Sequence, residues 1–329
     1  MPIASVVSTK CKKTKYNIMN ERIQIAAKLL ASHIILIICL IFLSILTTKD
    51  AFLFISISQT VLIILYFSGY WEFFGIRFQK YFCGLVELFL ILVFVWRLNG
   101  DQNRNVNLHL VLILSIIQVY LFFELTKALV VIKGRDRKYL DIEFPFKHGS
   151  YLVTDGGNSR LSRLMNYHYY SPTHKKNKTN DSMLYATDIV KIKKNKSDFL
   201  PKSNNEYPIF EEEIFSPING IIVKVENSIS DNNPFEGNYP YNTGNSVVIK
   251  KDNYYLLLGH LKKNSIIVKE GDIIQSNDLI GLVGNSGWTE RPHLHMQLIE
   301  SESSNFWFGK GVCIRYAKKN LYKNRIIQI

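Results

Sequence analysis

Four long apolar stretches crowd the N-terminal part of the chain, at residues 29–46, 51–71, 82–96 and 106–123. Together they contain a single formally charged side chain, that of Glu87. A helix needs roughly 20 apolar residues to cross a bilayer. Because the connections between the stretches are short, the pattern predicts a membrane region of about four transmembrane helices over residues 25–133, after a basic arm at residues 1–24.

The remainder of the chain, residues 134–329, is polar, rich in Lys and Asn, and punctuated by Gly and Pro. Over the whole chain 47% of residues are hydrophobic and 20% are charged, which excludes an intrinsically disordered protein. The 4 cysteines are too few for a disulfide scaffold. The formal net charge of +13 fits an anionic surface such as lipid headgroups, or a composition biased towards Lys and Asn. We expect no nucleic-acid partner.

Short runs of β-branched and aromatic residues follow one another in this polar part, at residues 221–225, 246–250, 254–258, 266–268 and 279–283. Turns rich in Gly and Asn separate them, and no helical periodicity is sustained. The pattern predicts an all-β, antiparallel, barrel-sandwich-like domain at residues 151–302. Residues 134–150 then form a linker, and residues 303–329 form a closing strand and a basic tail.

A His-x-His pair, His293 and His295, lies in one of the predicted strands. Residues i and i+2 of a strand point to the same face, so a metal ligand and a catalytic imidazole could stand side by side. His260 ends another run, and Asp188 lies inside an apolar run, where an unpaired carboxylate would be costly. Two histidines and a carboxylate that leave one position open form a catalytic zinc site, so these residues predict Zn²⁺.

The stretch at residues 281–298, GLVGNSGWTERPHLHMQL, resembles the signature of the LytM/lysostaphin-type zinc endopeptidases. In that family a Gly-rich turn leads into a His-x-His strand. Residues 216–222, 258–261 and 268–274 resemble three further segments of the family, in the same order. The resemblance covers about residues 150–302 and implies a zinc metallo-endopeptidase that cleaves peptide bonds of peptidoglycan, in cross-links or stem peptides.

The resemblance also implies a role for each candidate residue. Asp188 and His295 are implied as zinc ligands. His260 and His293 are implied as catalytic imidazoles, which orient water and stabilise the developing oxyanion.

The remaining zinc ligand of the family is a histidine that usually stands four residues before the aspartate, where this chain has Leu184. A variant of the family carries Gly-Gly-Asn, Asn-x-His and Tyr-Ala-x-Asp segments. Residues 156–158, 166–168 and 185–188 resemble that variant, with extra residues before the aspartate. We therefore expect His168 as this ligand rather than His174, which lies in a Lys/Asn-rich loop.

Flanking charge gives a conflicting orientation for the predicted membrane region. The basic arm is expected in the cytoplasm, and four spans would return the C-terminal domain to the same side. A peptidoglycan substrate requires the opposite side, and long C-terminal domains translocate despite flanking charge. We expect a multi-pass protein of the cell membrane, in contact with the lipid bilayer, with an extracytoplasmic peptidase domain.

Three alternatives to this function remain open. The altered spacing between His168 and Asp188 would fit a catalytically inactive, regulatory domain that is tethered to the membrane. The charge-based orientation would fit a zinc peptidase that acts in the cytoplasm. Residues 216–225 and 268–281 resemble a biotinyl/lipoyl carrier hairpin, but the Met-Lys-Met of such carriers is missing.

Overall fold

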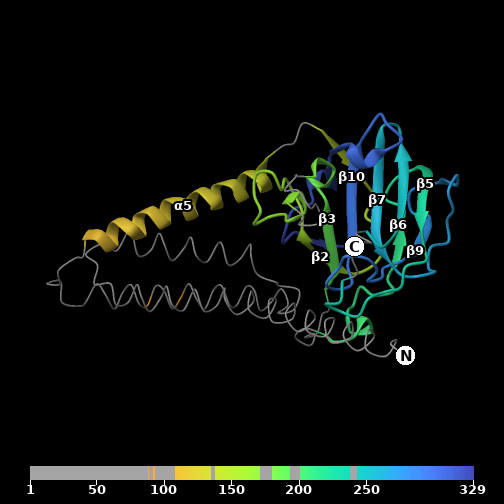
Figure 1. Ribbon diagram of the computed structural model, residues 1–329, viewed down its shortest axis with the longest axis horizontal. Helices are drawn as coiled ribbons and strands as arrows, with labels where there is room; N and C mark the ends of the chain where they lie inside the picture. Colours follow the sequence, from red (N-terminus) through yellow and green to blue (C-terminus); the bar gives the residue numbers. More distant parts are fainter. Residues whose placement is uncertain are drawn as a thin grey trace, which may run out of the picture.

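The computed structural model describes residues 108–134, 138–170, 180–192, 201–237 and 243–329, together with Leu88 and Leu92. A long helix, α5 (Leu108–Lys133), leads into a domain built from short strands, and Figure 1 shows the helix extending away from that domain. The strands are β1 (Tyr139–Asp141), β2 (Ser150–Asp155), β3 (Thr187–Lys191), β4 (Glu213–Phe215), β5 (Gly220–Glu226), β6 (Asn245–Lys251), β7 (Tyr254–Leu261), β8 (Ile273–Ile274), β9 (Leu279–Leu282), β10 (Leu294–Glu300), β11 (Lys310–Gly311), β12 (Cys313–Tyr316), β13 (Lys319–Asn320) and β14 (Ile326–Gln328).

One sheet dominates the domain. It has 9 strands in the order β14-β2-β3-β10-β7-β6-β5-β8, with β11 paired to β10, and its strand pairs are antiparallel. β10, β7 and β6 lie side by side at its centre (Figure 1). A smaller sheet joins β1 to β12 in parallel and β12 to β13, and β4 pairs with β9. Four short 3-10 helices interrupt the described loops: η1 (His168–Tyr170), η2 (Asp181–Met183), η3 (Asn204–Glu206) and η4 (Phe306–Phe308).

The end of α5 packs against the β domain. Leu125, Ala128 and Val131 recur at three-residue spacing on one side of the helix, and they form a buried cluster with Met165 of the domain. Gly157 meets the helix at the same place with φ +90°, and a Cβ atom there would lie 2.5 Å from Cγ1 of Val131. The helix and the domain are therefore joined by close packing.

The predicted membrane region of about four transmembrane helices is wrong for the residues that the structure describes. None of the helices described there is long and apolar enough to cross a bilayer. The last turns of α5 differ from an uncharged, lipid-facing helix. They bury apolar side chains against protein, and they carry Glu124 and Lys127, which form an ion pair 2.5 Å long, as well as Lys133.

The other three predicted spans, at residues 29–46, 51–71 and 82–96, lie outside the described residues apart from Leu88 and Leu92. The same holds for the basic arm at residues 1–24 and for His174. The location in the cell membrane and the predicted domain boundaries stay predictions.

The main core lies on one face of the large sheet, and the alternation of β-strand side chains decides which residues reach it. Leu256 of β7 and Met296 and Leu298 of β10 point into this core, where each is at most 1% exposed. His295 and Gln297 alternate with these β10 residues and therefore lie on the opposite face of the sheet. The core consequently fixes the direction in which the candidate metal ligand points.

We expect Leu256→Ala to lower the free energy of unfolding by about 2–5 kcal/mol, because a fully buried side chain is replaced by a cavity next to β10. Urea titration of the variant against the parent measures this loss. Ile221→Ala, at an exposed side chain of the same sheet, is the control and should change the stability by less than about 1 kcal/mol. Equal losses would show that the strand is not packed as described.

Candidate metal centre

Two of the predicted ligands face each other across neighbouring strands. Asp188 of β3 and His295 of β10 are register partners in an antiparallel pair, so their side chains rise from the same face of the sheet. Nδ1 of His295 lies 2.9 Å from Oδ1 of Asp188. The pairing of β3 with β10 thus joins residues that are 107 positions apart in the chain.

His168 reaches the same place from η1, outside the sheet. Its Nε2 atom lies 3.2 Å from Oδ2 of Asp188, and its ring centroid lies 4.9 Å from that of His295. The other ring nitrogen of His168, Nδ1, is 2.8 Å from Oδ1 of Asn166. The structure therefore brings together the three residues that the sequence predicts as ligands, while their role as ligands stays a prediction.

The two predicted catalytic histidines lie beside this group. Nε2 of His293 is 3.4 Å from Oδ1 of Asp188, and the ring centroids of His293 and His260 are 4.8 Å apart. Each ring is held through Nδ1 by a backbone carbonyl, that of Arg291 at 2.8 Å for His293 and that of Ser286 at 2.7 Å for His260. Because carbonyl oxygens only accept, both Nδ1 atoms carry a proton. Nε2 of His293 faces a carboxylate oxygen, which also only accepts.

The described residues contain two groups of three side chains that could hold a metal ion, and both include His295. The first is His168, Asp188 and His295, and the second is His260, His293 and His295; the ligand atoms of each group lie within 4.8 Å of one another. The first group supplies two imidazoles and one carboxylate. This donor set is typical of catalytic zinc sites, which take three protein ligands and leave a fourth position open.

Burial and the charge of Asp188 set the protonation of the site in the metal-free chain. Burial lowers the pKa of His260 well below its ordinary value, and His293 and His295 add to the effect. Burial also lowers the pKa of His295, although Asp188 partly opposes this. For Asp188, burial favours the neutral form, but His168 and His293 outweigh it and hold the pKa well below the usual range. For His168, burial opposes the charged form, but Asp188 outweighs it and raises the pKa of this ring. The metal-free site therefore combines the Asp188 carboxylate with neutral His260 and His295 rings and a His168 ring that holds its proton more tightly, and this proton would be released on metal binding.

The loop at residues 243–245 positions His260 through a close backbone contact. Gly244 has φ +59°, and a Cβ atom there would overlap the carbonyl group of Ser286 and lie 2.5 Å from its Oγ atom. That carbonyl is the one that accepts the Nδ1 proton of His260. Only a glycine leaves room for this arrangement.

We expect Gly244→Ala to lower the free energy of unfolding by more than about 2 kcal/mol, because it combines left-handed backbone strain with an overlap that must displace Ser286. Denaturant titration measures the loss. NMR of the His260 ring should show a shifted signal. Gly271→Ala is the matched control: its φ is +92°, but nothing lies within 4 Å of the added carbon. It should lose only about 1–2 kcal/mol and leave the His260 signal in place. Equal losses of stability and equal His260 signals in the Gly244→Ala and Gly271→Ala variants would show that the close contact with Ser286 is unimportant.

No role was assigned from the sequence to the residues that hold these rings, although Asn166 belongs to the Asn-x-His segment. Asn166 and Gln297 are buried amides next to His168 and His295, and Thr289 Oγ1 lies 3.1 Å from Nδ1 of His293. A signal for one of them was present, since Gln297 follows His295 at i+2 in a strand and so shares its face. Asn166 stands in a loop, where spacing does not fix the direction of a side chain.

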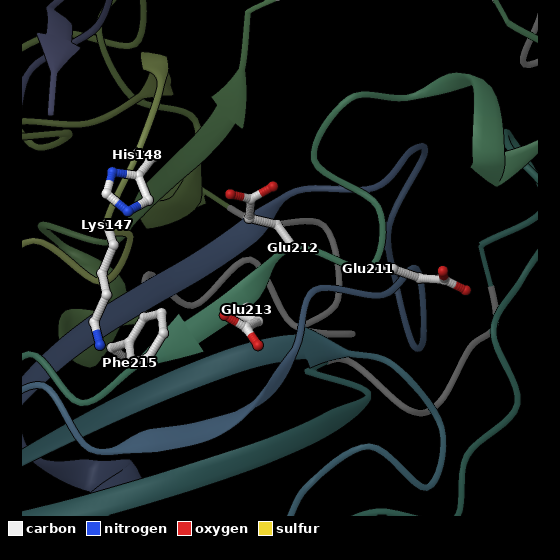
Figure 2. A pocket seen from close by; sticks show the side chains of 6 residues that line it. All are labelled: Lys147, His148, Glu211, Glu212, Glu213 and Phe215. Carbon is white, nitrogen blue, oxygen red and sulfur yellow. The ribbon is translucent and has the colours of Figure 1, made fainter.

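A surface pocket of the described residues lies apart from this group. It is lined by Lys147, His148, Glu211, Glu212, Glu213 and Phe215, and Figure 2 shows these side chains. The charges are neutralised locally: Glu212 pairs with Lys191 at 2.6 Å, and Glu211 pairs with Lys262 at 2.6 Å. Lys147 lies over the Phe215 ring at 3.7 Å. None of the predicted site residues lines this pocket.

Residues 208–306 match the model of Peptidase family M23. The peptidoglycan DD-endopeptidase ShyA of Vibrio cholerae serotype O1 is 44% identical over 62 residues, which is 19% of this chain and 14% of the relative. An uncharacterized metalloprotease of Buchnera aphidicola subsp. Baizongia pistaciae is 38% identical over 72 residues, 22% of this chain and 19% of the relative. The matches thus cover less than one fifth of the length of either relative.

Solved structures with partial overlap include a zinc containing peptidase from Vibrio cholerae, at 19% identity and a TM-score of 0.31, over 51% of this chain and 37% of the other. The catalytic domain of lysostaphin from Staphylococcus simulans overlaps at 19% identity and a TM-score of 0.27, over 43% and 83%. His260, His293 and His295 fall inside the segment matched by the family model, whereas His168 and Asp188 precede it. The matches to the family model and to the curated relative identify a Peptidase family M23 domain, of the LytM/lysostaphin type, in this chain.

Proposed function

We propose that this domain is a zinc metallo-endopeptidase that hydrolyses peptide bonds of peptidoglycan. The observation that carries the proposal is the convergence of His168, Asp188 and His295, whose ligand atoms lie within 4.8 Å of one another. A catalytic zinc ion is typically held by three protein ligands, and two imidazoles with one carboxylate form one of the usual sets. One carboxylate and two neutral imidazoles leave a bound Zn²⁺ with a net charge of +1, which favours an anionic transition state.

Zinc, when bound, supplies a Lewis acid that polarises the scissile carbonyl group. The remaining chemistry falls to His260 and His293. Each ring donates its Nδ1 proton to a backbone carbonyl, which leaves Nε2 as the nitrogen that can exchange a proton. Burial keeps His260 in its neutral form, so its Nε2 atom can accept. One ring accepts the proton of the attacking water on its Nε2 atom, and a ring that carries a proton on Nε2 can donate to the negative charge that develops on the substrate. The separation of 4.8 Å between the ring centroids allows both rings to reach one peptide group.

The substrate class is supported by the curated relative, whose name states that it is a peptidoglycan DD-endopeptidase. It is also supported by the excess of basic residues, 40 Lys and Arg against 27 Asp and Glu, which favours an anionic polymer. The masses of the released fragments identify which peptide bond of peptidoglycan is cleaved.

Mass spectrometry of purified peptidoglycan after incubation with the zinc-loaded full chain tests this function. We expect new peptide fragments, and we expect none when the zinc is first removed with a chelator. Fragments that persist without zinc would contradict the metal-dependent mechanism. A folded, zinc-bound chain that releases no fragments would instead support the second candidate, a binding domain without hydrolytic activity, which the 20-residue separation of His168 and Asp188 favours.

A further inference from the structure

The loop that follows β5 contacts the loop between β9 and β10, and two polar residues, Asp231 and Asn232, lie where the loops meet. Asp231 forms an isolated antiparallel bridge with Ser286, whose carbonyl group accepts the Nδ1 proton of His260 at 2.7 Å. We propose that Asp231 and Asn232 are positioning residues, which hold the Ser286 carbonyl against His260 and thereby fix the orientation of that ring. The consequence for catalysis rests on the proposed function.

Asn232 holds the peptide groups on both sides of Ser286. Its Nδ2 atom lies 2.8 Å from the carbonyl oxygen of Asn285 and 2.7 Å from that of Gly287. Carbonyl oxygens only accept, so the atom that faces them is the amide nitrogen, and both of its protons are used. The backbone N–H of Asn232 also donates to the Asn285 carbonyl, at 2.9 Å. A side chain 53 and 55 positions away in the chain therefore secures both neighbours of Ser286.

Asp231 links the same loop to the segment that follows His260. Its Oδ1 atom accepts from the backbone N–H of Asn285 at 2.7 Å, and its Oδ2 atom accepts from the backbone N–H of Lys263 at 3.1 Å. Lys263 stands three residues after His260, and Asn285 stands directly before Ser286. One carboxylate thus joins the segment that carries the ring to the segment that carries its acceptor.

The carbonyl of Ser286 belongs to a peptide group that lies between the two groups held by Asn232. Peptide groups are planar, so a group whose neighbours on both sides are fixed has little freedom to rotate. The hydroxyl of Ser286 makes separate bonds, to the Leu261 carbonyl at 2.7 Å and from the Asn245 backbone N–H at 2.8 Å, and these fix the side chain rather than the carbonyl. Ser286 is 0% exposed, so water has no access to replace a lost bond there.

The substitutions Asn232→Asp and Asn232→Gln separate hydrogen bonding from shape. Asp has the shape of Asn but, when ionised, turns an acceptor towards two carbonyl oxygens, whereas Gln keeps the donor on a longer side chain. We expect Asn232→Asp to lower kcat on a defined peptidoglycan fragment roughly 10–100-fold, the cost of a small displacement of a catalytic group. KM should stay within about two-fold of the parent value, because the displaced ring acts on the reacting atoms. Asn232→Gln should lose less.

Asn233→Asp is the matched control, because it makes the same chemical change one residue further along. Asn233 is exposed, and its Nδ2 atom donates to Oε2 of Glu236 at 3.0 Å instead of to the loop before β10. Its kcat should equal that of the parent. Circular dichroism shows which variants fold. If Asn232→Asp does not fold, Asp231→Asn takes its place, since it removes only one of the two acceptors for Asn285 and Lys263.

Proton NMR of the zinc-free full chain reads the contact itself, because a ring N–H held by a buried carbonyl exchanges slowly with water. We expect a protected Nδ1 proton for His260 in the parent and in Asn233→Asp, assigned by its loss in His260→Ala. Exchange should be at least about tenfold faster in Asn232→Asp, or in Asp231→Asn.

A folded Asn232→Asp or Asp231→Asn chain that keeps the protected His260 proton would overturn the inference, as would an Asn232→Gln chain that loses more activity than Asn232→Asp. The same holds if Asn233→Asp accelerates exchange as much as Asn232→Asp does. A parent that shows the expected signals but releases no peptidoglycan fragments would contradict the proposed function while supporting the positioning role.

Discussion

His295→Ala is expected to abolish peptidoglycan hydrolysis, with a loss on the order of 10³-fold or more. His295 belongs to both groups of side chains that could hold the metal, and it is 3% exposed, so a solvent molecule has little access to replace it. Loss of the metal removes several kcal/mol of transition-state stabilisation, and each 1.36 kcal/mol corresponds to a factor of about ten in rate. Fragment release from peptidoglycan and zinc content per chain are the two measurements.

His148→Ala provides the matched control for this substitution. His148 is an exposed histidine that lines the surface pocket of Figure 2 rather than the metal centre. Its replacement should leave both zinc content and hydrolysis unchanged. Circular dichroism of the two variants shows whether the sheet is retained. A folded His295→Ala chain that still binds zinc and releases fragments would refute the assignment of the metal centre.

The candidate site could be predicted from sequence to the extent that its residues lie in local patterns. The His-x-His spacing predicted that His293 and His295 stand together, and the structure places both beside Asp188. The contact between Asp188 and His295 could not be derived in this way, because it depends on the register of β3 against β10 across more than 100 residues. A shift of that register by one residue would turn Asp188 to the other face of the sheet.

In the fold, too, the sequence predicted features that depend on neighbouring residues better than features that depend on distant contacts. The alternating runs at residues 221–225 and 246–250 became β5 and β6, whose ends differ from the prediction by only one residue on each side. The run at residues 266–268 did not become a strand of the described sheets. The apolar stretch at residues 106–123 predicted a membrane span, and the large apolar side chains described in it are exposed. The helix continues to Lys133 and buries Ala128 against Met165 of the domain.

His260→Ala is expected to lower the rate of hydrolysis about 10²–10⁴-fold, the usual contribution of a group that moves a proton in the transition state. The physical reason is the fixed tautomer of His260: the Ser286 carbonyl holds its Nδ1 proton, and burial keeps the ring neutral with a free lone pair on Nε2. Substrate affinity should change much less than kcat, because the lost interaction forms with the reacting atoms. Steady-state kinetics on a defined peptidoglycan fragment measure both quantities.

The zinc affinity of the same variant decides between the two groups of donors around His295. If the metal is held by His168, Asp188 and His295, His260→Ala loses activity but keeps its zinc, while His168→Ala loses both. If the metal is held by His260, His293 and His295, the two variants exchange their behaviour, because His260 then becomes a ligand. We expect the first result, since that group contains the carboxylate whose charge the buried site retains. The second result would make Asp188 a partner that orients the histidines rather than a ligand.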